Sequence, residues 1–238
     1  MERLIVKKLS NSLKMSKLSL LRTYFWYLPQ SIYFNFKFLP FSQAIKLPIF
    51  LYRPHFIKLK GEVRIEADHI YLGMIQMGKL INTCNPNNGI TFAITGTIIF
   101  KGKAIFANDS YIMIRDNGKL ILGNDIDCNC KIKCAKSIEI GDETWVAYET
   151  MIMDSDWHAL TDMCTGKLLK KTDPVRIGKH NFISYKCIVT KGTVTPDNAT
   201  FMPCSTLNKV YEEGEYPLFG GNPCELKDEG FYMDHKNN

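Results

Sequence analysis

The segment Asp154-Ser155-Asp156-Trp157-His158 combines residue types from which a proton-transfer site can be built. Histidine ionises near neutral pH, so His158 can take a proton from a hydroxyl group. A carboxylate from Asp156 or Asp154 can fix the imidazole tautomer and raise its basicity. Trp157 can form a stacking wall for a sugar ring or for the arm of a thioester. The spacing alone also fits a loop histidine capped by its own aspartates, so both interpretations stay open.

A period of six residues predicts the frame that must hold this segment. Six differs from the 3.6-residue period of an α-helix and from the simple alternation of a strand. It is typical of short strands joined by tight turns and stacked coil upon coil, the hexapeptide-repeat parallel β-helix. The residue after many repeat positions is small or turn-prone, such as Gly123, Asn129 and Gly141, which suits a corner. The first run is Leu122, Cys128, Cys134, Ile140, Val146 and Ile152, and the second is Ile177, Ile183, Val189, Thr195, Phe201 and Leu207.

The two runs are out of phase with each other. Ile152 and Ile177 are 25 positions apart, one more than four repeats of six. The stretch 153–174 between them is polar and contains His158. We therefore expect the chain to leave the coil here as a loop, where solenoids often place binding or catalytic residues.

Three cysteines, Cys128, Cys130 and Cys134, have a spacing that could bind a metal ion. Two of them, however, occupy repeat positions, where a small buried residue is expected, and a free cysteine behaves as a small hydrophobe. We therefore expect no metal site. The chain has eight cysteines, and because we find no convincing export signal we expect reduced thiols and a cytoplasmic protein.

Charge is distributed unevenly along the 238 residues, whose net charge is +6. Residues 1–60 contain eleven Lys or Arg and one acid, a balance of +10, so the other 178 residues carry −4. The same sixty residues hold twelve of the 28 aromatics. We expect this region to plug the open end of the solenoid, to contact an anionic membrane surface, or to do both. No apolar stretch is long enough for a transmembrane helix.

The predicted organisation has three parts. Residues 1–58 form a basic, aromatic cap that is partly helical, with an amphipathic helix over 1–24. Residues 59–210 form the β-helix, interrupted by the loop at 153–174, and residues 211–238 form a C-terminal tail. The fold class is therefore an all-β solenoid with an irregular N-terminal region.

Several motifs, in order along residues 95–227, resemble those of the hexapeptide-repeat O- and N-acyltransferases, which include the maltose, galactoside and nodulation acetyltransferases. The N-terminal stretches Asn35-Phe-Lys-Phe-Leu-Pro-Phe and Ala44-Ile-Lys-Leu-Pro-Ile resemble a group of polysaccharide-locus acyltransferases. The four motifs of the main likeness are Ile140-Gly-Asp-Glu-Thr-Trp-Val-Ala, Asp154-Ser-Asp-Trp-His158, Pro174-Val-Arg-Ile-Gly-Lys-His-Asn-Phe-Ile-Ser184 and Tyr216-Pro-Leu-Phe-Gly-Gly-Asn-Pro-Cys.

This resemblance implies a left-handed β-helix, a homotrimer and an acyl-CoA bound between neighbouring subunits. It implies that His158 is a general base that deprotonates an acceptor hydroxyl, which attacks the thioester without an acyl-enzyme or a metal ion. It places Ser184 against the pantetheine arm and Lys209 near the nucleotide phosphates. Pro203 stands where the family usually has a small alanine.

We therefore expect an acetyl-CoA-dependent O-acetyltransferase that acts on a saccharide in polysaccharide or lipid-linked glycan biosynthesis. We expect no nucleic-acid partner, and a location in the cytoplasm, peripheral at the inner membrane surface. N-acetylation of an amino sugar and a non-catalytic scaffold or binding protein are the alternatives. The predicted site comprises His158 and Asp156 as catalytic residues, Trp157 and Asp154 as substrate contacts, and Ser184, Pro203 and Lys209 as contacts of the acyl donor.

Overall fold

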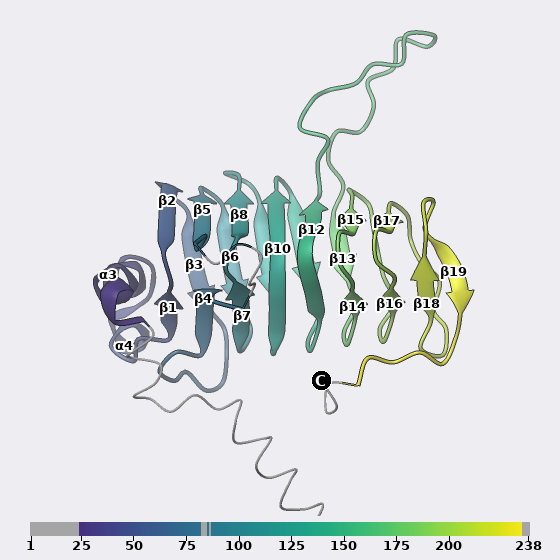
Figure 1. Cartoon of the computed structure of the whole chain (residues 1–238). Coiled ribbons are helices and arrows are strands. Elements are labelled where there is room, and N and C mark those ends of the chain that lie inside the picture. Colours follow the sequence, from purple (N-terminus) through teal and green to yellow (C-terminus); the bar gives the residue numbers. More distant parts are fainter. Residues whose placement is uncertain (1–23, 82–84, 86, 235–238) are drawn as a thin grey trace, which may run out of the picture.

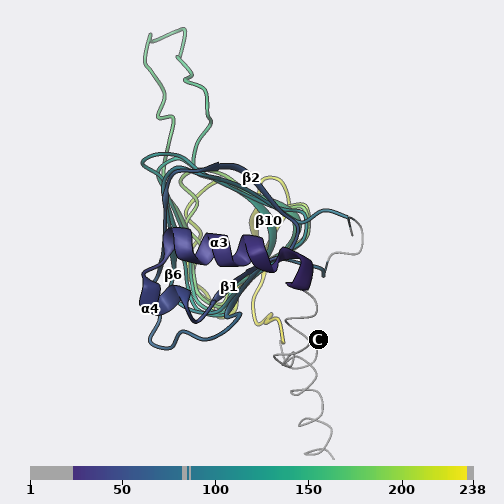
Figure 2. The same cartoon turned by 90° about the vertical axis from the view of Figure 1, so that its left-hand side faces the viewer.

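The computed structural model describes residues 24–81, 85 and 87–234. They form a parallel β-helix whose coils stack along one axis, with a loop that projects from the side of the stack (Figure 1). The predicted amphipathic helix over 1–24 lies outside the described residues except for Tyr24. The coils are roughly triangular when viewed along the axis (Figure 2), so each full coil has three faces and three corners.

Parallel strands make up the three faces. The first face contains β1 (Ile49–Leu51), β4 (Ile75–Lys79), β7 (Ala104–Ala107), the starts of β10 (Ile126–Cys134) and β12 (Trp145–Met153), β14 (Phe182–Ile183), β16 (Thr200–Phe201) and β18 (Leu218–Gly220). The second face contains β2 (Pro54–Leu59), β5 (Ile90–Ile94), β8 (Ser110–Ile114), the ends of β10 and β12, β15 (Ile188–Val189) and β17 (Thr206–Leu207). The third face contains β3 (Glu62–Ile65), β6 (Thr97–Phe100), β9 (Lys119–Leu122), β11 (Ser137–Ile140) and β13 (Val175–Ile177).

The six-residue period is confirmed as the core of the solenoid. All twelve residues of the two predicted runs are buried. They also stack on one another, since Val146 pairs with Ile183 and Ile183 pairs with Phe201 in the parallel ladder. Apart from Thr195, whose hydroxyl donates a hydrogen bond to Asn181, an apolar side chain fills the interior at each such step, and removing these side chains from water stabilises the fold.

Both ends of the solenoid extend beyond the predicted range 59–210. β1 and β2 already pair in parallel with β4 and β5, so the first coil begins at Ile49. Pro54 is compatible with β2 because this strand lies at the end of the ladder, where a missing N–H leaves no partner unpaired. At the other end β18 adds a strand, and β19 (Glu225–Asp228) turns back on it in the antiparallel direction and ends the parallel ladder.

A helical cap closes the N-terminal end. The 3-10 turn η1 (Phe25–Tyr27), α3 (Leu28–Phe38) and α4 (Phe41–Ala44) precede β1, and α3 lies across the open end of the coils (Figure 2). The buried amide of Asn35 accepts a hydrogen bond from the N–H of Ile49 and donates one to its C=O, at 3.1 and 2.7 Å. The Ser31 hydroxyl accepts one from the N–H of Leu51. These side chains satisfy backbone groups at the free edge of β1.

Aromatic packing joins this cap to the first coils. Phe92 on β5 is fully buried, and its ring lies 5.5 Å from that of Phe34 on α3 and 6.0 Å from that of Phe56 on β2, centroid to centroid. We expect Phe92→Ala to lower the free energy of unfolding by about 3 to 5 kcal/mol, because the cavity cannot close fully. Phe36→Ala, on the exposed side of α3, should change it by less than about 0.5 kcal/mol. Urea titration measures both, and equal losses would contradict this account of the cap.

Candidate functional site

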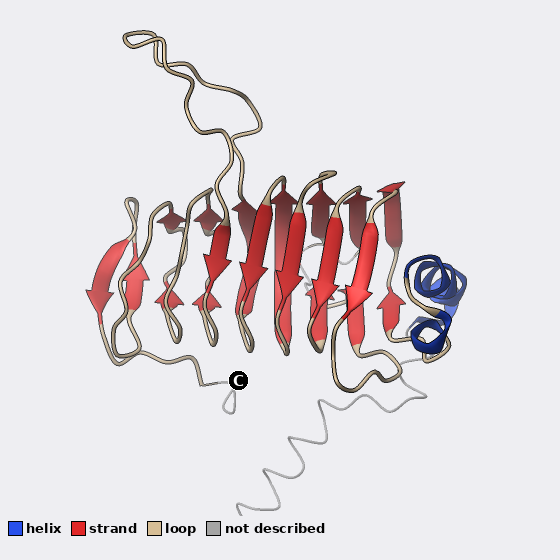
Figure 3. Cartoon of the chain, turned by 180° about the vertical axis from the view of Figure 1, so that it is seen from behind, coloured by secondary structure: helices blue, strands red, loops and turns tan. Residues whose placement is uncertain are grey.

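Residues 154–174, here called the arm, leave the coil between β12 and β13 and return to it (Figure 1). Figure 3 shows this segment as a long loop that rises away from the coils. Its two sides are joined by bridges between Ser155 and Thr172 and between Thr161 and Leu168. The predicted excursion was 153–174, and in the structure Met153 is still the last residue of β12.

Asp154 fixes the first side of the arm to the preceding coil. Its buried carboxylate accepts hydrogen bonds from the backbone N–H groups of residues 135, 136 and 137, each at 2.7 Å. The Cys134 thiol lies 3.5 Å from the same carboxylate. Burial, and then the nearby charge of Asp154, raise the pKa of this thiol well above its usual range, so Cys134 stays protonated. This geometry gives Asp154 an anchoring role, and its predicted contact with substrate gains no support from it.

Asp156 connects the arm to a later coil. Its carboxylate forms an ion pair with Lys191, which follows β15, and Lys191 also donates a hydrogen bond to the C=O of Lys170 on the returning side of the arm. The link between Asp156 and His158 is a backbone one, from the N–H of His158 to the C=O of Asp156 at 2.7 Å. The orienting role of Asp156 toward the imidazole therefore stays a prediction.

Trp157 has a strained backbone and two cationic neighbours. Its φ of +64° lies in the left-handed region, which costs a bulky residue energy that the surroundings must supply. The Arg115 guanidinium lies 4.9 Å and the Lys133 ammonium 5.4 Å from the centre of a Trp157 ring. The indole N–H is shielded from solvent and has no hydrogen-bond acceptor. The Trp157 ring, which was predicted to stack on a sugar, thus lies against the second face of the coils, next to two positive charges.

His158 follows these three anchored residues and has an exposed side chain. Asp154, Asp156 and Trp157 contact three separate parts of the solenoid, so the backbone that carries His158 is tightly held. A base that must meet an incoming hydroxyl group needs this combination of a fixed backbone and an accessible ring.

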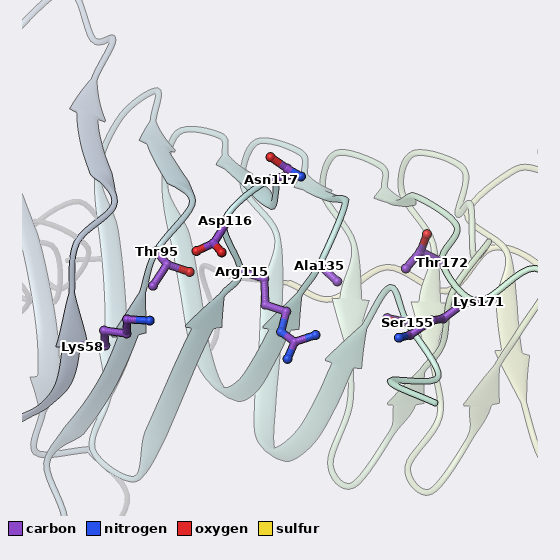
Figure 4. Close-up of a pocket in the computed structure, with 9 residues that line it drawn as sticks. All are labelled: Lys58, Thr95, Arg115, Asp116, Asn117, Ala135, Ser155, Lys171 and Thr172. Atoms are coloured by element: carbon purple, nitrogen blue, oxygen red, sulfur yellow. The ribbon is translucent and has the colours of Figure 1, made fainter. Parts of the chain in front are cut away.

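A groove of about 440 Å³ lies at the base of the arm, and sequence reasoning did not predict it. Figure 4 shows its lining residues spread across successive coils, from Lys58 on β2 to Thr172 on the arm. A signal was present, because four lining residues are spaced by twenty. Three of them directly follow the last inward residue of a second-face strand, and Ser155 follows the buried Asp154 at the start of the arm. These four are Thr95, Arg115, Ala135 and Ser155, and the others are Lys58, Asp116, Asn117, Lys171 and Thr172.

The residues predicted to contact the acyl donor lie at two different corners. Lys209 follows β17 at the corner between the second and third faces, the same corner from which the arm leaves. Ser184 and Pro203 follow β14 and β16 at the corner between the first and second faces. The chain therefore brings Lys209 and the arm to one corner and Ser184 and Pro203 to another.

Cys128, Cys130 and Cys134 are buried in the core. A hydrogen bond with Cys130 and burial raise the pKa of the Cys128 thiol well above its usual range, which disfavours the thiolate that metals bind. Across residues 24–81, 85 and 87–234, no group of three or more His, Cys, Asp or Glu side chains is placed to hold a metal ion.

No protein-family model matches the sequence, and no curated protein matches it. Among solved structures, the chain is similar to the polysialic-acid-specific acetyltransferase NeuO, with a TM-score of 0.50, 14% identity and coverage of 77% of this chain and 89% of that one. The fold is that of the left-handed β-helix acetyltransferases. This confirms the predicted fold class, including its handedness, which is an exception to the usual right-handed crossover.

Two further solved structures have lower TM-scores. A hexapeptide-repeat acetyltransferase from Vibrio cholerae O1 biovar eltor, in complex with acetyl coenzyme A, has a TM-score of 0.38 at 10% identity and covers 84% of each chain. A mutant of the N-acyltransferase AntD from Bacillus cereus, in complex with an amino sugar nucleotide and coenzyme A, has a TM-score of 0.39 at 13% identity and covers 73% of this chain and 84% of that one.

The anchor at Asp154 gives a direct test of how the arm is held. We expect Asp154→Ala to lower the free energy of unfolding by about 3 kcal/mol or more, because three backbone N–H groups lose a charged acceptor. Asp68→Ala, at an exposed aspartate, should change it by less than about 0.5 kcal/mol. Chemical denaturation and limited proteolysis of the arm are the measurements. An Asp154→Ala protein as stable and as protease-resistant as the control would contradict this anchoring role.

Proposed function

We propose that the protein transfers an acetyl group from acetyl-CoA to a hydroxyl group of a saccharide, with His158 as the general base. The observation that carries the proposal is the exposed imidazole on a backbone held by three neighbouring anchors, at the point where the arm leaves the coil. The left-handed β-helix and the order of the sequence motifs support it. Asp156 and Trp157 are the further residues that we assign to this site.

The chemistry follows from what an imidazole can do. The free ring nitrogen of His158 takes the proton of the acceptor hydroxyl while its oxygen attacks the thioester carbonyl. The tetrahedral intermediate then collapses, the C–S bond breaks, and the leaving CoA sulfur takes the proton back from the imidazolium. A backbone N–H near the coil would stabilise the negative oxygen. No covalent acyl-enzyme and no metal ion takes part in these steps.

We propose that the active assembly is a homotrimer. Ser184 and Pro203 lie at a different corner from the arm, so a neighbouring subunit is needed to bring a donor bound there close to His158. The arm also carries apolar side chains that one subunit leaves uncovered, with Met163 90% exposed and Leu160 and Leu168 more than half exposed. Packing these side chains against a second copy would remove apolar area from water.

Substituting the proposed base tests the reaction. We expect His158→Ala to slow acetyl transfer by about two to four orders of magnitude, because proton removal by a positioned base is lost. Its oligomeric mass and its affinity for acetyl-CoA should stay as in the unmodified protein. His69→Ala, at another exposed histidine, is the matched control.

The measurement is CoA release from acetyl-CoA with a panel of nucleotide-activated, lipid-linked and amino sugars. Equal rates for His158→Ala and the unmodified protein would overturn the assigned base. Transfer to amino sugars alone would favour N-acetylation, and no transfer to any sugar would favour a non-catalytic binding protein.

We also propose that the N-terminal end of the solenoid contacts an anionic membrane surface, from the cytoplasmic side. Residues 24–61 contain five Lys or Arg and no acid. On the same cap the side chains of Trp26 and Phe41 are 80% and 71% exposed. Cations beside exposed aromatic rings suit the headgroup region of anionic lipids. None of the described helices is both long and apolar enough to cross a bilayer.

Vesicle co-sedimentation tests this contact. We expect binding to vesicles that contain phosphatidylglycerol and little binding to neutral phosphatidylcholine vesicles. Lys37→Glu with Lys46→Glu should weaken binding by more than about tenfold, since each cation near such a surface contributes about 1 kcal/mol. Lys119→Glu with Lys227→Glu makes the same charge change away from the cap. Equal losses from the two double variants would contradict a contact through this end.

A further inference from the structure

The groove at the base of the arm forms a path across the coils rather than a closed cavity. Thr95, Arg115, Ala135 and Ser155 occupy the same corner of four successive coils. Neighbouring strands in a sheet lie about 4.8 Å apart, so this row extends for roughly 14 Å. Three of the four side chains are small, and the long Arg115 side chain lies between them (Figure 4). The shape suits an extended chain that approaches the arm from the N-terminal coils.

The net charge along this path is positive. Lys58, Arg115 and Lys171 line the groove, and Asp116 is the one acid among its lining residues. Among the described residues, no carboxylate forms an ion pair with these three cations. Two acids of the arm form ion pairs, Asp156 with Lys191 and Asp173 with Lys170, and its other two, Asp154 and Asp162, accept backbone hydrogen bonds. The groove therefore attracts anions.

One of the groove residues, Arg115, also contacts Trp157, the residue before His158. Arg115 and Lys133 lie over Trp157, and the indole N–H of Trp157 has no acceptor although it is shielded from solvent. A buried donor without a partner is costly, and so is the left-handed backbone of Trp157. A strained residue that carries an unsatisfied donor, one position before the proposed base, points to a ligand that supplies the missing acceptor.

We propose that the carboxylate of an acidic sugar unit in the acceptor glycan binds beside this groove, through Arg115, which lines it, and through Lys133 and the indole N–H of Trp157, which lie next to Arg115 and outside the lining. A carboxylate has two acceptor oxygens and a full charge, so its hydrogen bonds to these donors are charge-assisted. The indole N–H is shielded from solvent, so the side chains that cover it must shift for it to reach the carboxylate. Because His158 follows Trp157 directly, the hydroxyl groups of the bound unit lie within reach of the imidazole. This inference rests on the proposed acetyl transfer and adds that the acceptor glycan is negatively charged.

The phosphates of CoA are the other source of anionic oxygens, and a binding experiment separates the two. The full-length protein is titrated by calorimetry, without acetyl-CoA, with oligomers of galacturonic, glucuronic and sialic acids. Neutral maltooligosaccharides of matched length and CoA itself are titrated in parallel. We expect at least one acidic oligomer to bind about tenfold tighter than the neutral one, and more weakly as salt is raised.

The double variant Arg115→Gln, Lys133→Gln should lose about tenfold or more of the acidic-oligomer affinity and keep its CoA affinity. Lys101→Gln, Lys103→Gln removes the same charge at another corner and should keep both affinities. Trp157→Phe retains an aromatic ring without the N–H and should lose about threefold. Equal binding of acidic and neutral oligomers, binding of neither, or loss of CoA affinity in the first variant would overturn the proposal.

His158→Ala separates this inference from the proposed reaction. It should bind the acidic oligomer as tightly as the unmodified protein does, because no contact of the carboxylate is removed. An enzyme that acetylates neutral sugars, with rates unaffected by Arg115→Gln, Lys133→Gln, would overturn the acidic acceptor and leave the reaction standing. A protein that binds the acidic oligomer through Arg115 and Lys133 but transfers no acetyl group would overturn the proposed reaction and leave the acidic ligand standing.

Discussion

From β1 to β18 the strands of the solenoid pair in parallel with strands of neighbouring coils, so the chain must return to the same corner after every turn. The arm obeys this constraint. Val146 pairs with Ile183, 37 positions later, whereas Ile183 pairs with Phe201, 18 positions later, so the arm adds 19 residues to one coil without shifting the ladder. The insertion therefore leaves the core packing intact. It also places the start and the end of the arm side by side at one corner, where neighbouring coils can hold both.

The anchors of the arm use the repeated backbone of this frame. A coil corner presents several backbone N–H groups close together, and the Asp154 carboxylate accepts three of them from the preceding coil. Lys191 lies at the equivalent corner of a later coil and reaches Asp156. Trp157 lies on the face formed by earlier strands, against Arg115 and Lys133. The stack thus holds the base of the arm, while the outer arm carries exposed apolar side chains.

The repeat could be predicted from the sequence because every sixth residue is buried and is therefore small or apolar. The twelve period residues identify the core, and the phase slip after Ile152 locates the arm. The start of the solenoid at Ile49 was missed because prolines such as Pro54 suggest irregular structure, and only the position of β2 at the end of the ladder makes Pro54 acceptable. Asp156 and Lys191, which form an ion pair, are 35 positions apart, so no local sequence pattern predicts their contact. The groove was not predicted from the sequence, because the four residues spaced by twenty share a position in the coil but differ in residue type.

The central claim is that this frame holds His158 for acetyl transfer to a sugar hydroxyl. Mass spectrometry of an acceptor glycan incubated with the protein and acetyl-CoA tests it most directly, before and after mild alkali. An ester is cleaved by mild alkali and an amide is not. The account predicts a glycan that gains the mass of one acetyl group and loses it on alkaline treatment. A glycan that gains no acetyl group, or one that keeps it through alkali, would contradict the claim.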